Sequence, residues 1–103
     1  MSDLFAALGD PTRRHVIEQL AVRESVTASE LARELPITRQ AVSKHLAVLD
    51  GAGLLGVTRE GREVRYRLRA EPLEEAAGWL ATVGGEWDSR LARLRRVAQG
   101  SDP

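Results

Sequence analysis

The residues of this 103-residue sequence that are best suited to chemistry lie on one predicted helix, residues about 38–50. One stripe of that helix combines small or hydrogen-bonding side chains with long cations: Arg39, Gln40, Ser43, Lys44 and Ala47. Amide and hydroxyl groups can approach base edges closely, while arginine and lysine bind guanine or phosphate. The stripe therefore predicts a helix that enters a DNA groove.

Residue types that would support other chemistry are scarce. The chain has no cysteine, which excludes disulfides and thiolate metal ligands. Its two histidines, His15 and His45, fall in different predicted helices without a second ligand at metal spacing. No activated nucleophile, paired-carboxylate cleft or glycine-rich phosphate loop is recognisable. We therefore expect no metal, no cofactor and no enzymatic activity.

Charge is segregated along the chain, although the formal net charge is zero. Residues 38–69 contain seven basic residues and three acidic ones, a net charge of +4. Residues 1–37 and residues 70–103 each carry a net charge of −2. A basic region in an otherwise neutral protein favours local phosphate binding without general adhesion to polyanions.

Length and hydropathy bound the class of protein. A chain of 103 residues predicts a single domain, residues 1–103, with little room for deep pockets. No apolar run approaches a membrane span, and Met1–Asp10 lacks the basic start of a signal peptide. We expect a soluble, cytoplasmic protein that does not bind membranes.

Helix signals place the DNA-facing helix after three others. Leu4, Phe5 and Leu8 form a short helical stripe, and Asp10-Pro11 begins a helix that runs to about Arg23. The segment 27–30 fits a capping box that begins the next helix, which Pro36 ends. Ile37 then fills the corner, Thr38 caps the DNA-facing helix, and Gly51 and Gly53 stop it.

From residue 54 to about residue 69 the hydrophobic period changes to two, which predicts a β-hairpin with Glu60-Gly61 in its turn. Arg59 and Arg62 flank the tip, where arginine can reach a narrow minor groove. Arg65 is also expected to contact DNA, whereas Arg67 and Arg69 are interpreted as a solvated strand face. A helix pair followed by a two-stranded wing predicts a mostly α (α+β) winged helix-turn-helix.

The last predicted helix, residues about 72–98, has an apolar repeat of seven residues that passes through Gly84-Gly85 without a change of phase. We therefore interpret it as one long helix, straight or kinked at the glycines. Its stripe exceeds what a small core can cover, which predicts a homodimer. Trp79 and Trp87 are interpreted as interface rather than as an effector pocket. The expected interface comprises Leu4, Phe5, Leu8, Leu73, Leu80, Trp87, Leu91 and Leu94.

Residues 4–98 resemble the ArsR-type winged-helix transcriptional repressors. The resemblance rests on LFAALGDPTRRHVIEQL, on ELARELPITRQAVSKHLAVLDGAGLL and on VTREGREVRYRL. It implies a homodimer that represses its own operon through a near-palindromic operator, and it makes Arg62 the wing-tip contact. The DNA contacts that it implies on the recognition helix are Thr38, Arg39, Gln40, Ser43, Lys44 and His45. For His45, packing at the edge of the helix pair remains an alternative.

The chain departs from the metal sensors of that family. Those sensors place cysteines where this chain has Leu31, Ala32 and Arg33, or pair Asp with His in the last helix, which has no histidine here. The resemblance therefore implies the subgroup without metal ligands and leaves any small-molecule effector unidentified. The alternative function is a winged-helix protein-interaction module that does not bind DNA.

Overall fold

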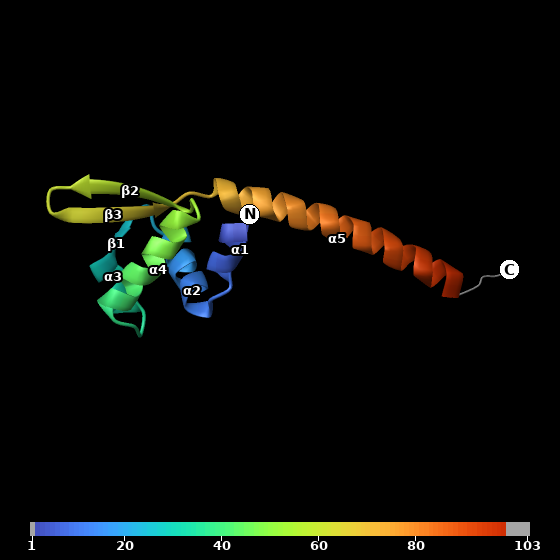
Figure 1. Ribbon diagram of the computed structural model, residues 1–103, viewed down its shortest axis with the longest axis horizontal. Coiled ribbons are helices and arrows are strands. Elements are labelled where there is room, and N and C mark those ends of the chain that lie inside the picture. Colours follow the sequence, from blue (N-terminus) through green and yellow to red (C-terminus); the bar gives the residue numbers. More distant parts are fainter. Residues whose placement is uncertain (1, 99–103) are drawn as a thin grey trace. The chain divides into compact units, whose positions relative to one another are not determined.

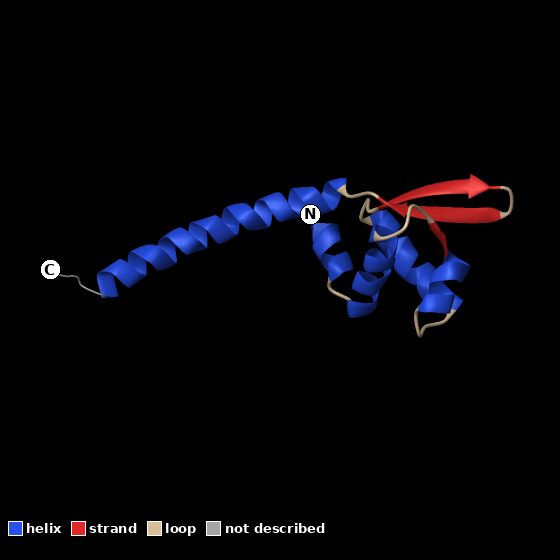
Figure 2. Cartoon of the chain, turned by 180° about the vertical axis from the view of Figure 1, so that it is seen from behind, coloured by secondary structure: helices blue, strands red, loops and turns tan. Residues whose placement is uncertain are grey.

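The computed structural model describes residues 2–98, so Met1 and residues 99–103 of the expected domain lie outside the described part. The elements are α1 (Ser2–Leu8), α2 (Pro11–Ala21), β1 (Val26–Thr27), α3 (Ala28–Glu34), α4 (Arg39–Gly51), β2 (Leu55–Glu60), β3 (Glu63–Leu68) and α5 (Glu71–Ala98) (Figures 1 and 2). The expected domain of residues 1–103 comprises two compact units, which meet in sequence after Leu73.

Three side-chain caps fix where the helices of the first unit begin. Asp10 Oδ1 accepts a hydrogen bond from the Thr12 amide at 3.3 Å, and Thr38 Oγ1 accepts one from the Ala41 amide at 3.1 Å. Thr27 and Glu30 form the predicted capping box, with bonds of 3.1 and 2.8 Å. Each cap satisfies an amide that the helix leaves without an internal partner, so the predicted helix starts are confirmed.

The core of the first unit is made of apolar side chains from its helices and strands. Its fully buried large side chains come from α2, β1, α3, α4 and the segment before β2: Leu20, Leu31, Leu46, Leu49, Leu54, Val16, Val26 and Val42. Leu4 of α1 is only 3% exposed within the single chain. It therefore packs in the core of the single chain, and its expected place in a dimer interface stays a prediction.

The wing belongs to a three-stranded antiparallel sheet in the order β1-β3-β2. The sequence predicted the β2-β3 hairpin but missed β1, which pairs Val26 with Tyr66. A two-residue strand is too short to show a period of two. At the tip Glu60 pairs with Glu63, so the turn is Gly61-Arg62 and not Glu60-Gly61. Gly61 has a φ of +62°, which side chains other than glycine rarely adopt.

The recognition helix α4 extends one residue further than expected. Gly51 is its last helical residue, and the chain turns at Gly53, where φ is +77°. The Leu54 amide then donates a 3.0 Å hydrogen bond to the Leu49 carbonyl, which brings the chain into β2. Only Gly53 therefore acts as the predicted stop.

The second unit is the main part of α5, which continues through Gly84 and Gly85 as predicted. Its large apolar side chains are exposed: Trp79, Leu80, Trp87, Leu91, Leu94 and Val97. Between residues 2 and 98, no helix has both the length and the apolar character needed to cross a membrane.

The two glycines at the end of α4 should respond in opposite directions to alanine. Gly53→Ala should lower the free energy of unfolding by about 1 kcal/mol because alanine is strained at positive φ. Gly51→Ala, whose new methyl group meets nothing within 4 Å, should raise it by about 0.5 kcal/mol. Urea denaturation of both variants measures the difference, and equal effects would contradict the assigned helix end.

Candidate nucleic-acid interface

The polar stripe of α4 is open to solvent in the structure. Arg39, Gln40, Ser43 and Lys44 are all exposed and together line a surface hollow of about 450 Å³. Thr38, at the start of the helix, is exposed as well, but its hydroxyl is engaged as the N-cap. The side chains predicted to read DNA thus share one continuous face.

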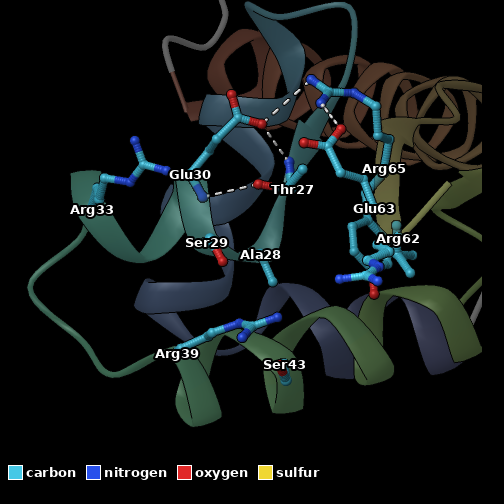
Figure 3. A pocket seen from close by; sticks show the side chains of 12 residues that line it. Thr27, Ala28, Ser29, Glu30, Arg33, Arg39, Ser43, Arg62, Glu63 and Arg65 are labelled. Carbon is cyan, nitrogen blue, oxygen red and sulfur yellow. Dashed lines mark hydrogen bonds and ion pairs between the residues drawn. The ribbon is translucent and has the colours of Figure 1, made fainter. Parts of the chain in front are cut away.

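A second hollow, called here the wing cavity, separates α3 and α4 from the wing and has a volume of about 530 Å³ (Figure 3). It is lined by Thr27, Ala28, Ser29, Glu30, Arg33, Arg39, Ser43, Arg62, Glu63, Val64, Arg65 and Tyr66. Residues from three separate stretches of sequence therefore meet around one space, next to the exposed face of α4.

Arg65 lies in the wall of this cavity and is engaged within the protein. Its Nε donates to Ser25 Oγ at 2.8 Å, and its Nη atoms lie 3.1 Å from Glu63 and 3.4 Å from Glu30 (Figure 3). Its side chain is only 24% exposed. Arg65 thus ties the wing to the start of α3, and its expected contact with DNA stays a prediction.

The carboxylate of Glu30 links the capping box to this tie. Hydrogen bonds from the backbone and side chain of Thr27, aided by the charges of Arg65 and Arg23, hold the pKa of Glu30 below its usual range. The carboxylate therefore stays ionised to a lower pH than an ordinary glutamate, and it can serve both the helix cap and the arginine.

His45 takes the alternative position that the sequence left open. Its side chain is 18% exposed, and its Nδ1 lies 3.4 Å from Asp10 Oδ2, the N-cap of α2. The ring therefore packs between α4 and α2 and away from the open stripe. This position favours the packing alternative for His45, and its role as a base or phosphate contact stays a prediction.

Most cations of the first unit have a hydrogen-bond or ion-pair partner within the chain. Arg13, Arg23, Arg65 and Arg69 form ion pairs, and Arg14 and Arg67 donate hydrogen bonds. Among residues 2–73, five cations have neither kind of contact with any described residue: Arg33, Arg39, Lys44, Arg59 and Arg62. Four of these five were predicted as DNA contacts from the sequence.

Arg33 is the one of these five cations that the sequence analysis did not single out. It lies in the acidic segment of residues 1–37, so charge patterning concealed it. In the structure its exposed side chain lines the wing cavity together with Arg39 and Arg62. Arg33 lies near Arg39 because α3 packs against α4, and no local pattern in the sequence predicts this packing.

The residues expected at a dimer interface divide into three groups. Leu4 is core, whereas Leu8 and Leu73 are half-buried and Phe5 is 37% exposed. Leu80, Trp87, Leu91 and Leu94 are exposed along α5.

Within the described residues, no group of three or more His, Cys, Asp or Glu side chains could hold a metal ion.

Comparison with known proteins gives consistent matches. A family model described as a helix-turn-helix domain matches residues 8–58. An uncharacterized HTH-type transcriptional regulator of Bacillus subtilis, YuzN, is 40% identical over 75% of this chain and 91% of its own length. The transcriptional repressor SdpR of Bacillus subtilis is 29% identical over 88% of this chain and 100% of its own length.

A solved structure described as an ArsR-like transcriptional regulator from Rhodococcus sp. RHA1 matches with a TM-score of 0.82 and 41% identity. The alignment covers 97% of this chain and 93% of that one. The match thus extends over nearly all of both chains.

Loss of the Arg65 tie should destabilise the first unit. Arg65→Ala leaves Glu30 and Glu63 without their shared partner and should cost about 1–2 kcal/mol of unfolding free energy. Arg65→Lys should restore only part of this, because lysine lacks the forked guanidinium. Arg67→Ala is the matched control on the same strand, since the Arg67 side chain is exposed and, among the described residues, hydrogen-bonds only Thr58. Equal losses for Arg65→Ala and Arg67→Ala in urea denaturation would contradict the tie.

Proposed function

The chain belongs to the ArsR-type winged helix-turn-helix transcriptional regulators and is a DNA-binding repressor, and we propose that it binds a near-palindromic operator as a homodimer. In this proposal α4 of each subunit enters the major groove, and the β2-β3 wing reaches the neighbouring minor groove. The operator controls the protein's own operon, and the signal that releases it is not a metal ion.

The observation that carries this proposal is the set of five cations in residues 2–73 that have no hydrogen-bond or ion-pair partner among the described residues. Four of them lie on α4 or at the wing tip, beside the exposed amide of Gln40. An arginine or lysine that is not paired within the protein keeps its full attraction for phosphate, and each phosphate neutralised releases counterions. We assign base reading to Gln40 and Lys44, and backbone or minor-groove contact to Arg39, Arg59 and Arg62.

The dimer in this proposal rests on α5. Regulators of this family bind DNA operators and act as dimers, and the exposed apolar residues of α5 recur at the seven-residue spacing of helix-helix packing. A two-fold dimer presents its two recognition helices to two equivalent half-sites, so the operator should have two-fold symmetry.

The independence from metal is supported by the chemistry of the chain. It has no cysteine, and its C-terminal helix has no histidine, whereas thiolate and imidazole are the ligands that transition metals prefer. A different signal, such as an organic effector, would then release the DNA. The site of action in this proposal is the cytoplasm, where the operator is found.

The operator can be identified by selecting bound duplexes from a random library. We expect a consensus with two-fold symmetry and half-sites about one helical turn apart. Its affinity should fall with salt at a log-log slope on the order of −4 to −8, because two subunits each neutralise several phosphates. A consensus without symmetry would contradict the dimer geometry, and a slope near zero would contradict DNA binding through these cations.

The role of α5 can be tested at its two adjacent glycines. Gly84 lies on the seven-residue stripe, and Gly85 lies beside it, and a Cβ at either meets nothing within 4 Å in the single chain. Gly84→Leu should weaken the dimer by about 10-fold or more, because a large side chain separates two closely packed helices. Gly85→Leu is the matched control with the same change in helix propensity. Sedimentation equilibrium measures both, and equal dissociation constants would exclude the stripe as the interface.

A further inference from the structure

The wing cavity has cationic side chains on two facing walls. Arg39 belongs to the first turn of α4, and Arg62 belongs to the β2-β3 turn. The two arginine side chains extend toward one another across the open space, with Ser43 beside Arg39 (Figure 3). A group lying between them would be reached from both sides.

The charge of this cavity is not balanced by its own residues. Its lining contains four arginines and two glutamates, a net charge of +2. Both glutamates contact Arg65, which leaves Arg33, Arg39 and Arg62 without a counter-charge among the described residues. The hydroxyl groups of Ser29 and Ser43, also in the lining, add neutral donors. Several cations and hydroxyls around one space form a site for an anionic oxygen group.

The two hollows divide the exposed face of α4. Gln40 and Lys44 line only the hollow on the outer side of the helix, whereas Arg39 and Ser43 line both hollows. Arg39 and Ser43 thus form the edge of α4 that faces the wing. If α4 lies in the major groove and the wing lies over the minor groove, the strand between these grooves passes along this edge.

We propose that the wing cavity binds one backbone phosphodiester of each operator half-site, held at the same time by Arg39 from α4 and Arg62 from the wing. This inference rests on the proposed function and names the partner group of that site. Arg33 adds positive charge at the α3 side of the cavity and is an additional DNA-binding residue. The phosphate acts as a bridge that fixes the register of the recognition helix and of the wing together.

The size and rigidity of the cavity suit this occupant. Its volume of about 530 Å³ lies within the usual range for ligand sites, about 300–1,000 Å³, and can hold a phosphate with part of its sugar neighbours. One wall is held in place by the capping box of α3, and the other by the hydrogen bonds of Arg65 to Ser25 and Glu63. Preformed walls reduce the entropy lost when the phosphate is bound.

The test uses the selected operator duplex with a neutral methylphosphonate at one backbone position at a time. With the unaltered protein, one position per half-site should weaken binding by about 10-fold or more, the loss expected for a charge-assisted contact. In Arg39→Ala and in Arg62→Ala, the same methylphosphonate should have less than about 2-fold effect, because the contact is already lost. Lower salt keeps the weaker complexes measurable.

Matched controls come from the same two elements. Lys44→Ala on α4 and Arg59→Ala on the wing remove cations that do not line the cavity, so both variants should keep the full methylphosphonate effect at that position. Arg33→Ala should reduce it only in part. If Arg39 and Arg62 couple to different phosphates, or to none, the bridging site is excluded while operator binding stands. If the unaltered protein selects no duplex at all, the proposed function fails and this inference fails with it.

Discussion

The arrangement of the first unit depends on one ionic junction, formed by Arg65, Glu30, Glu63 and Ser25. Arg65 belongs to β3 and Glu30 to the first turn of α3, so the junction joins two elements whose residues are 35 positions apart in sequence. Because β1 has only two residues, its backbone pairing with β3 gives the wing a short attachment. The arginine adds side-chain bonds at the same place, so the wing and the helix-turn-helix present their cations in a fixed relation.

Ion pairs of this kind also explain how a chain of zero net charge can bind DNA. Acidic side chains neutralise the arginines that hold the fold together, as Glu34 does for Arg23 and Asp10 does for Arg13. Within residues 2–73, the cations that have no partner among the described residues lie around α4, the wing tip and the wing cavity. The net charge of the chain therefore does not show whether it can attract phosphate. The distribution of ion pairs within the protein determines where the attraction is strongest.

The sequence predicted the helices, their caps, the wing and the long C-terminal helix, because each has a local signal. Thr27, Thr38 and Asp10 are capping residues at recognisable positions, and strand alternation marks the hairpin. The strand β1 was missed because two residues carry no period. The partners of His45 and Arg65 within the chain, Asp10 and Glu30, were not predicted because they are distant in sequence.

The sequence by itself determined which residues are helical, which stripe of α4 is polar and which segment is basic, since these properties depend on neighbours within a few positions. Only the tertiary structure decided which cations form ion pairs or hydrogen bonds within the protein. It placed His45 and Arg65 against acidic partners and Leu4 in the core, and it brought Arg33 into the lining of the wing cavity. The physical reason is that ion pairing and burial depend on distances between elements, and these distances are set by packing rather than by local pattern.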